Sequence, residues 1–146
     1  VREKRGLAYY VRSQNEQYLD VGNFVTQAGV DVVRIDDAIK VIVEQFVRMT
    51  TEKVTAEELG KAKEYMKGRF ILELEDSRAT ASLYASDELL ERELKTPQEI
   101  IKKIDEVNEA GVLAVAKDIF KENALNLAVI GPYKEKERFK KLLTFA

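Results

Sequence analysis

The sequence contains no histidine and no cysteine in its 146 residues. Histidine is the commonest protein ligand for metals and the commonest general base near neutral pH. A catalytic zinc site built from histidines and a Ser-His-Asp triad are therefore both excluded from this chain. The absence of cysteine excludes disulfide bonds, thiolate metal sites and cysteine nucleophiles, and is compatible with a reducing compartment.

A dominant charge of one sign and a long apolar run are also missing. The chain has 24 Lys and Arg against 26 Asp and Glu, a balance without the electrostatic footprint of a protein that binds nucleic acid or an anionic membrane. The longest apolar stretch, residues 39–47, is interrupted by polar residues and is too short to span a bilayer. We expect no nucleic-acid or membrane partner. We expect a soluble protein of the cytoplasm or periplasm, with any targeting signal outside this sequence.

The order of secondary structure predicts an α+β fold, an antiparallel sheet with helices packed on one face. Residues 7–13 and 19–28 are predicted strands, joined by a polar turn at residues 14–17. Helices follow, with an apolar face over residues 35–47 and capping boxes at Thr55–Glu58 and Thr96–Glu99. Residues 125–130 form an apolar run that predicts a buried strand returning to the first sheet. The length fits a single domain over residues 1–146.

The opening block holds the remaining candidates for chemistry, because no phosphate loop or spaced carboxylate pair occurs. Arg2 and Tyr9 lie seven residues apart around the segment Gly6-Leu7-Ala8. From spacing alone the signal is weak, because an Arg near a chain end is usually solvated and a strand Tyr usually packs with its hydroxyl in water. Arg5 and Tyr10 receive no functional role.

This block resembles the second-lobe signature of the pitrilysin family of zinc peptidases, the insulinase and mitochondrial-processing-peptidase type. In that signature an Arg precedes a Tyr by seven residues around a Gly-Leu-small-Tyr core, and Arg2 and Tyr9 hold those positions. Further matches follow in the family's order along nearly the whole chain: Ala28-Gly29, Glu58 to Gly68, Leu74-Glu75-Asp76-Ser77, Glu88-Leu89-Leu90, Thr96-Pro97, Ile104 to Val107 and Val129 to Pro132.

The resemblance implies the C-terminal, non-zinc lobe of a metallopeptidase, a hydrolase of peptide bonds. In the family a separate N-terminal lobe carries the zinc on an H-x-x-E-H motif, in the same polypeptide or on a partner subunit. This lobe would then contact the peptide substrate, with Tyr9 as the catalytic donor to the carbonyl oxygen and Arg2 and Tyr9 as substrate-binding residues. The resemblance implies no metal and no activity in this chain alone, and a lobe that lacks the family's first strand and helix.

Two other interpretations stay open from the sequence. Some members of the family have lost the zinc motif and act as non-catalytic binding or scaffold subunits. The retention of both Arg2 and Tyr9 favours the peptidase lobe, because a scaffold does not need the pair. A generic α+β domain ranks last, since it does not explain the ordered series of matches. The natural substrate and the oligomeric state are not indicated.

Overall fold

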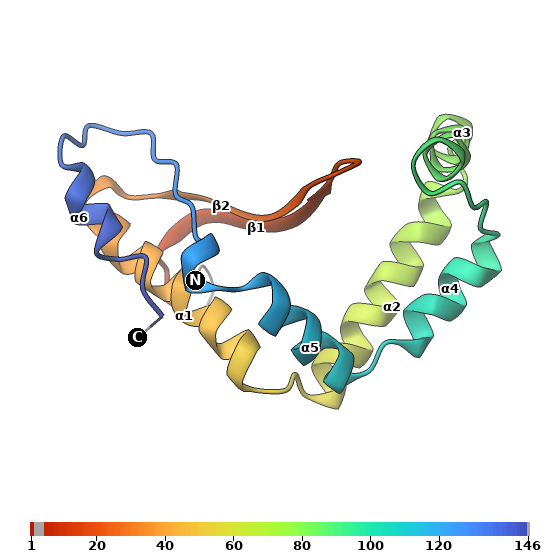
Figure 1. Ribbon diagram of the computed structural model, residues 1–146, viewed down its shortest axis with the longest axis horizontal. Helices are drawn as coiled ribbons and strands as arrows, with labels where there is room; N and C mark the ends of the chain where they lie inside the picture. Colours follow the sequence, from red (N-terminus) through yellow and green to blue (C-terminus); the bar gives the residue numbers. More distant parts are fainter. Residues whose placement is uncertain (2–4, 146) are drawn as a thin grey trace. The chain divides into compact units, whose positions relative to one another are not determined.

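The computed structural model describes residues 1 and 5–145, apart from the side chain of residue 91. Its described part contains one two-stranded antiparallel sheet and six α-helices, which confirms the predicted α+β class. Contacts divide the chain into two compact units, Val1–Glu52 with Leu113–Ala146 and the intervening Lys53–Val112 (Figure 1). Tyr9, the described candidate residue of the opening block, belongs to the first unit.

A long β-hairpin dominates the first unit. Strand β1 (Ala8–Gln17) pairs antiparallel with β2 (Gly22–Val30), and the Tyr18 N–H donates to the Val21 carbonyl at 2.9 Å to close the turn. The turn expected at residues 14–17 is wrong, because these residues continue β1 in the ladder. Polar side chains are tolerated there because that end of the hairpin is largely solvent-exposed, and pairing across strands outweighs composition.

Helices cover one face of the hairpin. Helix α1 (Ile35–Thr51) runs beneath it (Figure 1), and Ile35, Ile39 and Val43 form a core with Phe139 of α6 (Lys136–Lys140). Val30 of β2 packs against this core. Further along the hairpin, three rings from β2, α1 and the residue after α5 (Glu109–Ile119) meet: Phe24, Phe46 and Phe120. The sheet therefore has one covered face and one face without these helices.

The predicted strand at residues 125–130 makes no ladder with the described part of the chain. The segment is extended at Leu125, and Leu125 and Val129 pack against the α1 core, but Ile130 is fully exposed. A continuous apolar run predicts burial, and pairing requires in addition a strand edge in register. Part of this run is therefore buried as predicted, but the run does not pair with a described strand.

The second unit is helical, with α2 (Ala56–Glu73), α3 (Ser77–Ser86), a π-helical turn (Asp87–Glu91) and α4 (Pro97–Glu106). Both predicted capping boxes are confirmed, and Asp76 caps α3 by accepting from two backbone N–H groups. Helices α2 and α4 are joined by Lys67, whose ammonium lies 2.9 Å from the Asp105 carboxylate. Hydrogen bonds from this ammonium to Glu64 and Asp105 raise the pKa of Lys67.

The capping box of α4 makes a pH-dependent contribution to stability. The Glu99 carboxylate accepts hydrogen bonds from the Thr96 backbone N–H and hydroxyl, both at 2.7 Å, which lowers the pKa of Glu99 below its ordinary value of 4.5. A carboxyl whose pKa is lower in the folded state stabilises the fold above its unfolded pKa, and this contribution is lost as the pH falls through the folded pKa.

We therefore expect Glu99→Gln to lower the thermal midpoint at pH 7 and to approach the wild-type midpoint as the pH falls below about 4.5, the ordinary value. Thermal unfolding followed by circular dichroism between pH 7 and pH 2 measures this difference. Glu75→Gln is the control, since the Glu75 side chain makes no hydrogen bond or ion pair with the described residues. A Glu99→Gln deficit that stays constant with pH would contradict a charge-dependent cap.

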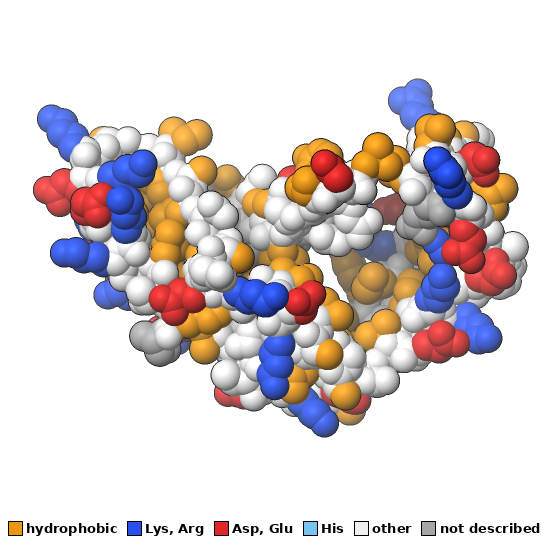
Figure 2. Space-filling view, in the orientation of Figure 1, with side chains coloured by type: hydrophobic (Ala, Val, Ile, Leu, Met, Phe, Trp, Pro, Cys, Tyr) orange, Lys and Arg blue, Asp and Glu red, His pale blue; other side chains and the backbone are white. Residues whose placement is uncertain are grey.

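The surface carries both charge signs. Figure 2 shows Lys and Arg side chains interspersed with Asp and Glu on the face in view, with hydrophobic side chains between them. The described ion pairs are exposed or partly exposed and several join residues one helical turn apart, including Lys61 with Glu57 and Arg69 with Glu73. No helix in the described part of the chain is long and apolar enough to cross a bilayer.

Candidate functional site

The segment that leads into β1 is fixed to α1. The Leu7 side chain is only 4% exposed and packs against Ala38 and Val41 of α1. The Arg5 guanidinium lies 3.2 Å from the Glu44 carboxylate of the same helix. Gly6 between them has a φ of +56°, a conformation that residues with a side chain rarely adopt. The backbone just before Tyr9 is therefore held against the helix by burial and by an ion pair.

Tyr9 is the extra residue of a β-bulge. The ladder is regular from Gln17–Gly22 back to Tyr10–Gly29, and the next pair is Ala8–Val30, so Tyr9 has no partner on β2. A bulge places two residues of one strand opposite a single residue of the other and redirects the side chains there. Bulges are over-represented next to active sites. The bulge therefore makes Tyr9 a candidate site residue, independently of the resemblance to a peptidase family.

The bulge determines which side chains face the helices. If β1 continued past Tyr10 without a bulge, its side chains would keep alternating between the two faces of the sheet. Tyr9 would then lie on the same face as Val11, which is the face covered by the helices. In the structure Ala8 faces the helices, with 9% exposure, and Tyr9 is 74% exposed. One inserted residue thus keeps the small Ala8 in the core and leaves the Tyr9 phenol in solvent.

Tyr10 occupies the space above Gly29. The two residues form a cross-strand pair, and a Cβ built on Gly29 would lie 2.8 Å from the Tyr10 Cδ1 and 3.2 Å from its Cζ. Ordinary contacts between carbon atoms are about 3.5–4.0 Å, so a side chain at residue 29 would displace the ring. The absence of a side chain on Gly29 is what allows the Tyr10 ring to lie against the backbone of β2.

The predicted site residues have different outcomes. The Tyr9 phenol is exposed and does not enter the hydrophobic interior. Arg2 lies outside the described residues. Arg5, which received no role from the sequence, is in the ion pair with Glu44. Sequence reasoning did not predict the bulge, because a bulge depends on the register between two strands.

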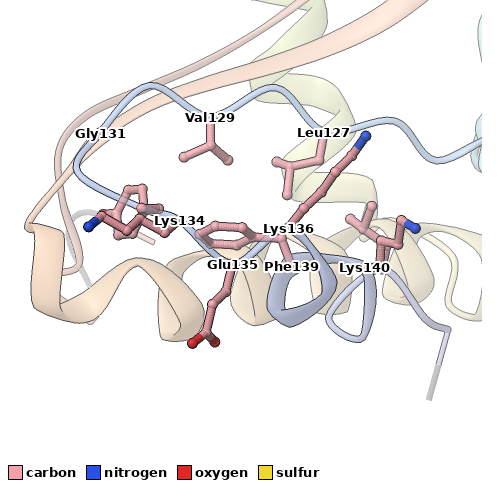
Figure 3. A pocket seen from close by; sticks show the side chains of 10 residues that line it. Leu127, Val129, Gly131, Lys134, Glu135, Lys136, Phe139 and Lys140 are labelled. Carbon is pink, nitrogen blue, oxygen red and sulfur yellow. The ribbon is translucent and has the colours of Figure 1, made fainter.

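A cavity elsewhere in the first unit does not include Tyr9. It has a volume of about 310 Å³ and is formed by residues between Leu127 and Leu143. Figure 3 shows Leu127 and Val129 pointing from the extended segment towards Phe139, while the charged end of Glu135 points away. The lining combines aliphatic and aromatic groups with flexible lysines, and we assign it no chemistry. Tyr9 instead presents its phenol on a strand surface.

The described residues do not fit a metal. No group of three or more acidic side chains in the described part of the chain has a geometry that could hold a metal ion. The complete sequence lacks both histidine and cysteine, the ligands zinc prefers. The donor set of this chain therefore does not match a zinc centre.

Comparison with known proteins identifies the class of domain. The sequence model described as the peptidase M16 inactive domain matches residues 1–66, which include β1, β2 and Tyr9. The fold is similar to that of a protease from Helicobacter pylori, with a TM-score of 0.71 and 26% identity over 82% of this chain and 29% of that chain.

Curated relatives give the same result. An uncharacterized zinc protease of Streptomyces coelicolor is 33% identical over 94% of this chain and 30% of its own length. The uncharacterized zinc protease YmxG of Bacillus subtilis is 34% identical over 90% of this chain and 32% of its own length. The chain thus spans about a third of the length of these relatives. Together the findings support a C-terminal, non-catalytic lobe of an M16-family peptidase, and they confirm the resemblance recognised in the sequence.

Proposed function

We propose that this chain is the substrate-contacting lobe of a zinc metallopeptidase that hydrolyses peptide bonds. The observation that carries the proposal is the Tyr9 phenol, exposed at a β-bulge within the segment that matches the M16 inactive domain. In this proposal the phenol O–H donates a hydrogen bond to the carbonyl oxygen of the scissile peptide bond, and Arg2 anchors the substrate.

The chemistry of peptide hydrolysis calls for such a donor. Attack on a peptide carbonyl develops negative charge on its oxygen, and a fixed hydrogen-bond donor directed at that oxygen stabilises the charge. A phenol is a neutral donor that needs no deprotonation for this role. Arginine stays charged and offers several N–H donors in a planar fork, which suits it to hold the carbonyl groups of a peptide.

The metal belongs to another lobe in this proposal, since the residues of this chain do not fit zinc. The relatives of similar sequence bear the name zinc protease and are about three times as long as this chain. We therefore propose that a zinc-bearing N-terminal lobe, in the same polypeptide or on a partner subunit, faces the exposed side of the hairpin. This chain and the zinc-bearing lobe together form what we call the complete peptidase.

Separating the lobes tests the proposal. The chain alone should take up less than stoichiometric zinc in equilibrium dialysis and should not cleave a quenched fluorogenic peptide. Addition of the zinc lobe should yield cleavage that neither lobe shows by itself. Tight zinc binding by this chain would contradict the assignment of the metal. Equal cleavage by the zinc lobe with and without this chain would favour a scaffold role.

A further inference from the structure

We propose that Tyr10 is a positioning residue for Tyr9, because the Tyr10 ring on Gly29 decides which of the two adjacent tyrosines is free to reach the substrate. This inference rests on the proposed function of Tyr9. It assigns a role to a residue whose own phenol takes no part in the reaction.

The two tyrosines can exchange places by a small shift of the bulge. In the structure Tyr9 is the unpaired residue and Tyr10 is opposite Gly29. If the bulge moved one residue towards the turn, Tyr9 would be opposite Gly29 and Tyr10 would become the unpaired residue, while Ala8–Val30 and Val11–Ala28 would remain paired. The flanking pairs are the same in both arrangements, so the two differ in which tyrosine ring lies on Gly29 and which is left unpaired.

The space above Gly29 accepts one aromatic ring. A Cβ at residue 29 would collide with the Tyr10 Cε1 and lie 2.8 Å from Cδ1, so the ring contacts the backbone directly. Gly29 is not among the residues with positive φ, so its lack of a side chain matters for space and not for backbone conformation. Because Tyr10 fills this space, Tyr9 remains 74% exposed and available to a ligand.

In this proposal catalysis depends on the Tyr10 ring, although this ring does not touch the substrate. Loss of the Tyr10 ring leaves the space open, and the Tyr9 ring can then settle on Gly29. Its phenol would leave the position in which it meets the carbonyl oxygen. A side chain at residue 29 would have a related effect, because it would displace the Tyr10 ring from the backbone of β2 and disturb the bulge that exposes Tyr9.

The test uses steady-state kinetics of the complete peptidase with a fluorogenic peptide. Tyr10→Ala should lower kcat by roughly ten- to a hundred-fold, the range for a misplaced catalytic group, with a smaller change in KM. Tyr10→Phe keeps the ring and should retain most of the activity. Gly29→Ala provides a second variant and should lower kcat in the same way, in case Tyr10→Ala does not fold.

A double mutant separates positioning from a general structural role. If Tyr10 acts through the Tyr9 phenol, Tyr10→Ala should cause little further loss of kcat in a Tyr9→Phe background. Equal losses in both backgrounds, or wild-type kcat in both Tyr10→Ala and Gly29→Ala, would overturn the inference. The proposed function fails separately, through unchanged turnover in Tyr9→Phe itself.

Discussion

Tyr9→Phe in the complete peptidase is expected to lower turnover by roughly ten- to a thousand-fold, the range for the loss of one oxyanion donor. The substitution removes a single hydroxyl from a side chain that is 74% exposed, so the fold should not change. The ring and the bulge are retained, and the missing group is the O–H proposed to donate to the carbonyl oxygen. The loss should appear in kcat and kcat/KM together, because the donor acts in the transition state.

Tyr18→Phe is the matched control. Tyr18 is 63% exposed and lies at the turn of the hairpin, at the far end of β1 from Tyr9, so removal of its hydroxyl should leave kinetics unchanged. Thermal midpoints of both variants should equal the wild-type value. If Tyr9→Phe turned over substrate at the wild-type rate, Tyr9 would have no place in the mechanism, and the scaffold interpretation would become the better account of this chain.

The second large effect concerns stability. We expect Phe139→Ala to lower the free energy of unfolding of the first unit by about 3–5 kcal/mol, the usual cost of truncating a buried Phe. The Phe139 ring is buried against Ile35, Ile39 and Val43 of α1 and makes an edge contact with Tyr133 at a centroid distance of 5.2 Å. Truncation leaves a cavity among side chains that cannot collapse fully into it.

Urea unfolding followed by circular dichroism measures this change. Ile130→Ala is the control, because Ile130 is fully exposed and its truncation removes no buried contact. Its free energy of unfolding should stay within about 0.5 kcal/mol of the wild-type value, as for most surface substitutions. A Phe139→Ala variant as stable as the control would show that α6 does not pack on α1 in solution.

The features that the sequence predicted well are those determined by local chemistry. Thr55 and Thr96 each begin a helix with a Glu three residues later, and both capping boxes form because every partner lies within one turn. The apolar spacing that begins at Ile35 predicts the face of α1 that forms the core. The α+β class followed from the positions of these helices after a predicted hairpin.

The features that were predicted wrongly depend on pairing between distant residues. The polar residues 14–17 suggested a turn, but each has a partner on β2. Residues 125–130 have the composition of a strand and yet pair with no described residue. Composition indicates which residues favour burial or solvent, whereas the register of a sheet depends on which strand lies beside it.

The candidate site shows the same division. The resemblance to a peptidase family predicted Tyr9 and Arg2 as site residues. Arg2 remains a prediction, because it lies outside the described residues. The bulge that exposes Tyr9 could not be predicted, nor could the contact of the Tyr10 ring with Gly29, because both follow from the register between β1 and β2. Two adjacent tyrosines look equivalent in the sequence and differ only in the pairing that each adopts.

A structure of the complete peptidase with a bound, uncleaved peptide would test the central claim most directly. The account predicts that the Tyr9 Oη lies at hydrogen-bonding distance, about 2.5–3.0 Å, from the carbonyl oxygen of the scissile bond. A peptide bound at the zinc lobe with its scissile carbonyl out of reach of the Tyr9 hydroxyl would contradict it.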